Sequence, residues 1–124
     1  MPRTILVVED HPVVREFVVT MLNGEGYRVI AAVDGRGALQ THESHAGIID
    51  LLLSDFDLGD TDGVALARKI LEKRPEMKVM IMSAWTPQWD NLDPSWGFLA
   101  KPFSVALLVA RVAAMLPKAD AAGA

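Results

Sequence analysis

Four apolar segments of this sequence end at residues that can take part in chemistry. One segment ends at the acidic pair Glu9 and Asp10, and another is followed by Asp55. The remaining two end at Ser83 and at Lys101. A carboxylate held at the rim of a rigid core and reachable by solvent can act as a nucleophile. The pattern therefore suggests a reaction at an acidic side chain, with a hydroxyl and a cation nearby.

The three carboxylates predict a divalent cation. Carboxylates a few ångströms apart repel one another and raise one another's pKa unless a cation joins them. Oxygen ligands without His or Cys suit Mg²⁺. Such an ion would also neutralise an incoming phosphoryl group, so that Asp55 could attack phosphorus in line. Lys101 would then pair with one phosphoryl oxygen, and the Ser83 hydroxyl would donate to another.

Hydrophobic periodicity predicts five strands that alternate with helices. The strands are predicted at residues 4–9, 28–33, 51–53 just before Asp55, 78–82 and 97–100. The helices are predicted at residues 12–22, 36–44, 63–74 and 105–116, with Asp34, Asp62 and Ser104 as N-caps. This alternation predicts an α/β three-layer sandwich with a parallel sheet. In the flavodoxin-like strand order 2-1-3-4-5, the first and third strands are neighbours, which brings the three carboxylates together.

Two segments depart from this pattern. Residues 84–96 contain two prolines and three tryptophans without a sustained period, so a shortened or irregular fourth helix is expected. Trp85, Trp89 and Trp96 are interpreted as packing residues, with a partner surface as the alternative. Residues 118–124 are predicted to be a flexible tail, which leaves residues 1–117 as one domain.

Composition limits the classes of function. The 124 residues carry a formal net charge of -4, which argues against a nucleic-acid partner because phosphate contacts need clustered Lys and Arg. No apolar run is long enough to span a membrane, and no secretory signal begins the sequence. The absence of cysteine fits a reducing cytoplasm. His11, His42 and His45 are interpreted as surface residues.

Four motifs together resemble the receiver domain of two-component response regulators. They are ILVVED at 5–10, DLLLSDFDLGDTDG at 50–63, MSA at 82–84 and FLAKPF at 98–103. The resemblance extends from Thr4 to Leu116. It implies that Asp55 accepts a phosphoryl group from a histidine kinase or a His-phosphotransfer protein. The resulting aspartyl phosphate would change a surface that binds a downstream protein or an adjacent domain.

The resemblance also implies roles for individual residues. A Mg²⁺ site would be formed by Glu9, Asp10, Asp55 and the backbone carbonyl of Asp57. The residues that respond to the phosphoryl group would be Ser83 as switch hydroxyl, Lys101 as phosphate-binding lysine and Phe98 as switch aromatic. The Lys101–Pro102 bond would be cis. The protein is expected to be a phosphoacceptor rather than an enzyme, although able to catalyse its own phosphorylation and dephosphorylation.

The sequence departs from the family pattern in three respects. Gly59 stands where the family usually has proline, which should loosen the loop after Asp55. The interval from Ser83 to Lys101 is short by about one helical turn, or roughly four residues. The FLAKPF ending also resembles receivers at the C-termini of hybrid histidine kinases. The chain is therefore either a stand-alone regulator or a domain of a longer protein, and its oligomeric state is open.

Two other classes of protein share parts of these motifs. A haloacid-dehalogenase-like phosphatase would use Asp55 as nucleophile, with Asp57, Ser83 and Lys101 beside it. That pattern expects Thr or Val at Gly59 and an acidic pair after the lysine, and the sequence has neither. A Ca²⁺-binding loop at DFDLGDTDG would place Gly59 and Leu66 at ligand positions, so its spacing fails.

Overall fold

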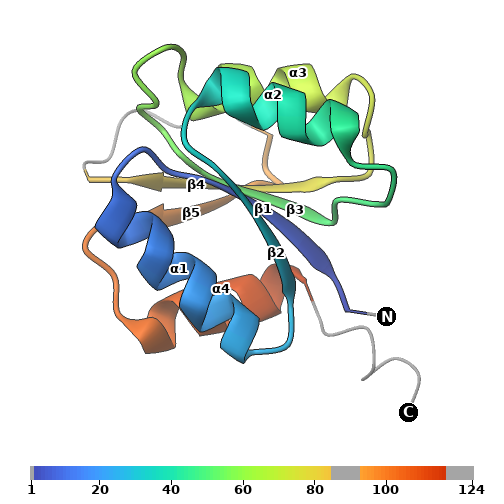
Figure 1. The fold of residues 1–124 in the computed structure, drawn as a ribbon. Coiled ribbons are helices and arrows are strands. Elements are labelled where there is room, and N and C mark those ends of the chain that lie inside the picture. Colours follow the sequence, from blue (N-terminus) through green and yellow to red (C-terminus); the bar gives the residue numbers. More distant parts are fainter. Residues whose placement is uncertain (1, 85–92, 117–124) are drawn as a thin grey trace.

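Five parallel strands form one sheet in the computed structural model, which describes residues 2–84 and 93–116 (Figure 1). The strands are β1 (Thr4–Val8), β2 (Arg28–Ala32), β3 (Leu51–Asp55), β4 (Lys78–Ser83) and β5 (Gly97–Ala100). The helices are α1 (Pro12–Gly24), α2 (Gly35–Ser44), α3 (Gly63–Leu71) and α4 (Val105–Met115). The strand order is β2-β1-β3-β4-β5, which confirms the predicted flavodoxin-like order 2-1-3-4-5.

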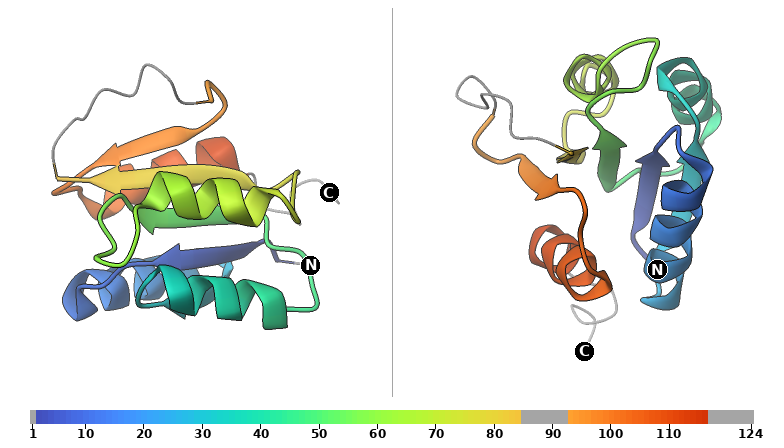
Figure 2. Two further views of the ribbon diagram at one scale, coloured as in Figure 1. Left: turned by 90° about the horizontal axis from the view of Figure 1, so that it is seen from above. Right: turned by 90° about the vertical axis from the view of Figure 1, so that its left-hand side faces the viewer.

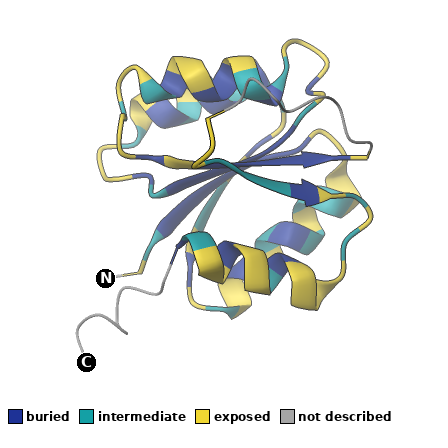
Figure 3. Cartoon of the chain, turned by 180° about the vertical axis from the view of Figure 1, so that it is seen from behind, coloured by how far each residue is buried: buried dark blue, intermediate teal, exposed yellow. Residues whose placement is uncertain are grey.

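Helices cover both faces of this sheet. Helices α2 and α3 lie on one face and α1 and α4 on the other (Figures 1 and 2). Leu6 and Leu52 point into the core beneath α2 and α3, whereas Ile5 and Leu53 point into the core beneath α1 and α4. Buried residues accordingly concentrate in the central strands and on the inward helix faces (Figure 3). Successive strand residues face opposite layers, which is why these strands are apolar runs and not alternating patterns.

The predicted helix starts are confirmed by their capping bonds. The Asp34 carboxylate accepts from the Gly37 amide at 2.8 Å, and Asp62 accepts from the Ala65 amide at 2.8 Å. The Ser104 hydroxyl accepts from the Leu107 amide at 3.1 Å. Each cap satisfies an amide that has no partner within its own helix.

Some boundaries and segments differ from the prediction or lie outside the described residues. Helix α3 ends at Leu71 and not at Arg74. After Leu71 the Lys73 amide donates to the Ile70 carbonyl, three residues back, which tightens the last turn, and Pro75 disfavours the helical conformation for Arg74. The predictions for Trp85, Trp89 and the tail at 118–124 concern residues outside those that the structure describes. Most of the expected irregular fourth helix also lies there, and the described residues 84 and 93–96 contain no helix.

His42 is buried, so its interpretation as a surface residue was wrong. Only 5% of its surface is exposed, and its Nδ1 accepts a 2.8 Å hydrogen bond from Nε of Arg74. The same arginine donates to the backbone carbonyls of His42, His45 and Gly47. Arg74 thereby joins the end of α2 to the segment that follows α3.

Within the part of the chain that the structure describes, no helix is both long and apolar enough to cross a membrane.

Candidate functional site

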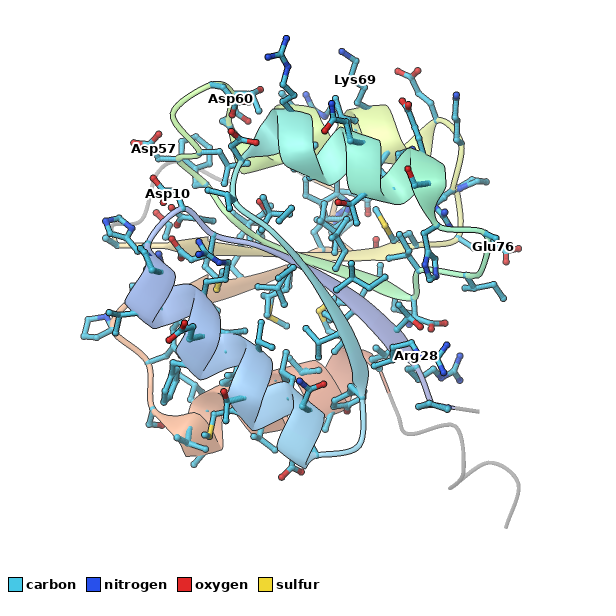
Figure 4. The ribbon with its side chains drawn as sticks, viewed as in Figure 1. Asp10, Arg28, Asp57, Asp60, Lys69 and Glu76 are labelled. Atoms are coloured by element: carbon cyan, nitrogen blue, oxygen red, sulfur yellow. The ribbon has the colours of Figure 1, made fainter. Side chains whose placement is uncertain are left out.

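The carboxyl ends of the strands bring the candidate residues to one edge of the sheet. Val8 of β1 pairs with Ser54 of β3. The next residues, Glu9 and Asp55, therefore lie side by side at the carboxyl ends of these two strands. The ladder to β2 extends to Glu9, whose amide donates to the Ala32 carbonyl at 3.2 Å. Figure 4 shows Asp10 and Asp57 at this same edge. The predicted convergence of acidic residues at the sheet edge is therefore present.

Lys101 links two of these carboxylates directly. Its Nζ lies 2.5 Å from Glu9 Oε1 and 3.1 Å from Asp55 Oδ1. Glu9 is fully buried and Asp55 is 8% exposed. The Lys101 amide also donates to the Ser83 carbonyl at 2.7 Å. This backbone bond extends the ladder of β4 and β5 and directs the lysine to the acidic residues.

The two carboxyls that contact Lys101 have opposite pKa shifts. Burial raises the pKa of Glu9, but hydrogen bonds from Lys101 and the His11 amide outweigh burial, so the pKa lies below its ordinary value. Burial raises the pKa of Asp55, and the contact with Lys101 only partly offsets this. Burial lowers the pKa of Lys101. The hydrogen bonds and charges of Glu9 and Asp55 outweigh burial, so the pKa of Lys101 lies above its ordinary value. Lys101 is therefore a cation at neutral pH.

His11, interpreted from the sequence as a surface residue, also lies in the site region. Its Nδ1 lies 3.3 Å from Glu9 Oε2 and 3.2 Å from Asp10 Oδ1. The ligand atoms of these three residues form a compact group that could hold a metal ion, and Asp55 lies outside that group. In the sequence, the feature that could have indicated this location is the position of His11 directly after the acidic pair Glu9 and Asp10. Arg15 supports the same loop by donating to the Glu9 carbonyl at 2.9 Å.

Asp57 begins a short hairpin that leads to α3. Asp57 and Asp62 form an antiparallel bridge, closed by hydrogen bonds from Leu58 to Thr61 and from Gly63 to Phe56. Neither of these bonds uses the Asp57 carbonyl. Asp57 and Asp62 are thus a non-hydrogen-bonded antiparallel pair, in which the amide and carbonyl of each residue point away from the partner segment. The Asp57 carbonyl is therefore directed out of the hairpin, at the edge that carries the carboxylates.

Gly59 shapes the turn of the hairpin that follows Asp57. Its φ of 82° is left-handed, and its amide donates to Asp57 Oδ1 at 3.1 Å. Gly59 and Asp60 are the two central residues of the turn between Leu58 and Thr61. A glycine with positive φ at the first central position is typical of a tight two-residue hairpin turn. Proline, with φ fixed near −65°, could not adopt this conformation.

The donor set at this edge fits a hard divalent cation. The carboxylates of Asp10 and Asp55 and the carbonyl of Asp57 are oxygen donors, which Mg²⁺ prefers. Both Glu9 oxygens are already engaged, by Lys101 and by His11. Glu9 would therefore contribute mainly negative charge and orientation, and Asp10, Asp55 and Asp57 would hold the ion.

The remaining predicted residues lie on β4, β5 and the loop that follows. Ser83 is buried at the end of β4 and pairs with Ala100. Phe98 lies on β5, is half-buried and packs against the core beneath α2 and α3. Its carbonyl accepts from Arg111 of α4 at 2.8 Å. The Lys101–Pro102 peptide bond is cis.

An apolar groove lies next to Lys101. It has a volume of about 540 Å³ and is lined by Val13, Val14, Phe17, Ala84, Lys101, Pro102 and Phe103. Val13, at its rim, is 80% exposed. The groove therefore offers an apolar surface that continues into the acidic site.

The chain belongs to the response regulator receiver domain family, which matches residues 5–113. It is 36% identical over 121 residues to the sensor kinase CckA of Brucella abortus (strain 2308). It resembles the crystal structure of the receiver domain of the hybrid histidine kinase CckA, with 35% identity and a TM-score of 0.74. That match covers 91% of this chain and 98% of the other. These relatives identify it as a receiver domain of two-component signal transduction, and the haloacid-dehalogenase-like alternative is not favoured.

A third relative is a response regulator in complex with a metal. TrrA of Thermotoga maritima, solved in complex with Mg²⁺-BeF, is 29% identical with a TM-score of 0.78. The match covers 92% of this chain and 99% of TrrA.

The chain spans only part of the curated relatives that it matches. The alignment with the Brucella sensor kinase covers 94% of this chain but 13% of the kinase. It spans about half, from 48% to 54%, of several regulatory proteins. Many of these are named transcriptional regulatory proteins, so the expected absence of a nucleic-acid partner stays a prediction, as does the cytoplasmic location.

Proposed function

We propose that this receiver domain is a Mg²⁺-dependent phosphoacceptor in which Asp55 takes a phosphoryl group from a phosphohistidine. The observation that carries this proposal is the contact of the Lys101 amine with both Glu9 and Asp55. Among the described residues, Lys101 lies beside the carboxylates of Glu9, Asp10 and Asp55, so the edge stays negatively charged and a further cation and a phosphoryl group can be accommodated together. The raised pKa of Asp55 also makes its carboxylate more basic.

Transfer would form one bond and break another. An Asp55 carboxylate oxygen attacks phosphorus while the bond from phosphorus to the donor imidazole nitrogen breaks. The electron pair of that bond returns to the imidazole nitrogen, which takes up a proton from solvent to give neutral imidazole. Lys101 can donate a hydrogen bond to a phosphoryl oxygen, because its amine already lies 3.1 Å from Asp55. Bound Mg²⁺ would neutralise charge on the transferring group and hold it in line.

Phosphorylation would then be detected by Ser83 and Phe98. Ser83 lies at the end of the neighbouring strand and its carbonyl already accepts from the Lys101 amide. A hydroxyl drawn toward a new phosphoryl oxygen would move the end of β4. Phe98 of β5 pairs with Ile81 of β4, so a shift of β4 would change the packing of the half-buried Phe98 ring. The outcome would be an altered surface for a downstream protein or a domain of the same protein.

The apolar groove at Val13 is the surface on which the phosphohistidine donor would dock. It adjoins Lys101, so a partner seated there would present its histidine to Asp55. The donor would be a histidine kinase or a His-phosphotransfer protein. The relatives include a sensor kinase and a transcriptional regulatory protein. A domain of a hybrid kinase and a stand-alone regulator are therefore both alternatives for this chain.

Phosphorylation by a small donor tests the role of Asp55. The protein is incubated with acetyl phosphate and Mg²⁺, and its intact mass is measured. We expect a gain of a single phosphoryl group that is absent from Asp55→Asn and absent when EDTA removes the metal. Labelling by this donor would also show that the domain catalyses its own phosphorylation. Equal labelling of Asp55→Asn would contradict the assignment of Asp55, and continuous turnover of the donor without labelled protein would favour a phosphatase.

A further inference from the structure

The carboxylate of Asp60 binds the start of a helix that is distant in sequence. Its Oδ1 accepts from the Gly35 amide at 3.0 Å and its Oδ2 accepts from the Arg36 amide at 3.0 Å. Asp60 lies in the turn of the hairpin Asp57–Asp62, whereas both amides belong to α2. Figure 4 shows Asp60 on the loop before α3, where that loop approaches α2. The contact therefore joins the segment after Asp55 to a helix of the same layer.

This contact completes the hydrogen bonding at the start of α2. A helix leaves its first amides without partners inside the helix. Asp34 satisfies the Gly37 amide, and Asp60 satisfies those of Gly35 and Arg36. Two carboxylates at this end also interact favourably with the helix dipole. The second carboxylate comes from elsewhere in the chain, so it stabilises an arrangement of two segments as well as one helix.

The backbone of the hairpin is shaped for this approach. The left-handed φ of Gly59 makes the tight turn that places Asp60 at the tip. A side chain at Gly35 would collide with the Thr61 methyl group, so the two segments approach closely only because position 35 is glycine. Leu58, which is 3% exposed, anchors the other side of the hairpin in the core beneath α2 and α3. The hairpin is thus held at three points: Leu58, Asp60 and its own bridge.

We propose that Asp60 is a positioning residue for the phosphoacceptor site, holding the Asp57–Asp62 hairpin against α2 so that the Asp57 carbonyl faces the metal site. The inference rests on the proposed function, because it assumes that Asp57 contributes a carbonyl to Mg²⁺. Without the contact, the hairpin would lose its connection to α2 and its bridge would open more often. The carbonyl would then occupy a wider range of positions, and metal affinity would fall.

Calorimetric titration with MgCl₂ compares the wild type with Asp60→Ala, Asp60→Asn and Asp34→Ala. Asp34→Ala is a matched control, because it removes a carboxylate from the same helix end without touching the hairpin. We expect Asp60→Ala to weaken Mg²⁺ binding by about tenfold, the lower end of the effect of groups that orient metal ligands. Asp60→Asn keeps one acceptor oxygen and should lie between. Asp34→Ala should bind Mg²⁺ like the wild type.

Amide hydrogen exchange supplies a second measurement that does not depend on the metal. In metal-free protein, the Leu58 amide, which donates to Thr61, should exchange faster in Asp60→Ala than in Asp34→Ala. Equal Mg²⁺ affinities and equal Leu58 exchange in these two variants would overturn the inference while leaving the proposed function intact. A wild type that binds no Mg²⁺ would instead overturn the metal role in the proposed function, and this inference with it.

Discussion

Lys101 is a cation in direct contact with two buried carboxylates of the site, Glu9 and Asp55. It lies within 3.1 Å of two carboxylates, and the Asp10 carboxylate adds further negative charge that raises the pKa of Asp55. A buried charge without a partner is costly, whereas a paired and hydrogen-bonded one is tolerated. The lysine therefore has a structural role in the metal-free protein in addition to its proposed role in binding phosphate.

Replacing Lys101 by methionine tests this structural role. Lys101→Met keeps most of the aliphatic side chain but leaves the buried Glu9 without its cation. We expect the free energy of unfolding to fall by about 3 kcal/mol at neutral pH in EDTA, as for other broken buried pairs. Urea denaturation followed by circular dichroism measures it.

A double-mutant cycle with Glu9→Gln provides the control. If the loss comes from the unpaired Glu9 charge, Lys101→Met should cost clearly less in a Glu9→Gln background. Additive losses would show that the effect arises from packing and not from the ion pair.

At the scale of secondary-structure elements, Arg74 forms a joint between the end of α2 and the segment after α3. Arg74 donates four hydrogen bonds there, one to His42 Nδ1 and three to backbone carbonyls. The bond to Nδ1 requires that nitrogen to be unprotonated. The joint therefore depends on neutral His42.

Acidification should weaken this joint. Burial lowers the pKa of His42 below its ordinary value of 6.5, helped by the charges of Arg74 and Lys73 and opposed by Glu43. The unfolded chain therefore binds the proton more readily than the folded protein. The stabilisation is fully present above the unfolded pKa and is lost as the pH falls from 6.5 toward the lower pKa of the folded state.

Urea unfolding between about pH 5 and pH 8 measures this dependence. His42→Asn is the matched variant, since its amide oxygen can accept from Arg74 but does not titrate in this range. We expect the wild type to lose more stability than His42→Asn on acidification. Identical pH profiles would mean that His42 titrates alike in the folded and unfolded states.

At the scale of the whole molecule, the apolar groove exists only in the assembled fold. Its lining comes from α1, from the end of β4 and from the loop between β5 and α4. These segments are far apart in sequence but meet because α1 and α4 cover the same face of the sheet (Figure 1). The proposed docking surface is therefore a product of strand order.

A substitution at the groove rim separates docking from chemistry. Val13→Asn should slow phosphoryl transfer from a phosphorylated histidine kinase or His-phosphotransfer protein by roughly fivefold, the effect of about 1 kcal/mol. Labelling by acetyl phosphate, which needs no docking surface, should change little. Ile48→Asn is the control, because Ile48 is similarly exposed, at 75% against 80%, and lies outside the groove. Equal transfer rates for the two variants would exclude the groove as the donor surface.

Local signals were enough to predict the sheet and most helix boundaries. Continuous apolar runs such as Leu51–Leu53 indicate strands covered on both faces, and side chains such as Asp34 and Asp62 indicate helix starts. The strand order followed from the parallel connections together with the family resemblance. Because residues at the carboxyl ends of neighbouring parallel strands must meet, the closeness of Glu9, Asp55 and Lys101 could also be predicted.

Only the tertiary structure decided the hydrogen-bond partners of Asp60 and His42. Asp60 binds the start of α2, and His42, interpreted from the sequence as a surface residue, is buried and accepts a hydrogen bond from Arg74. Their partners lie 25 and 32 residues away in sequence. Such contacts depend on how two helices pack in the same layer, which no local pattern encodes.

The sequence by itself determined the elements and the edge where the reactive residues gather, because strand burial and capping are local. The contacts that hold the neighbouring segments in place were decided by packing, because they depend on the distances between elements that are far apart in sequence.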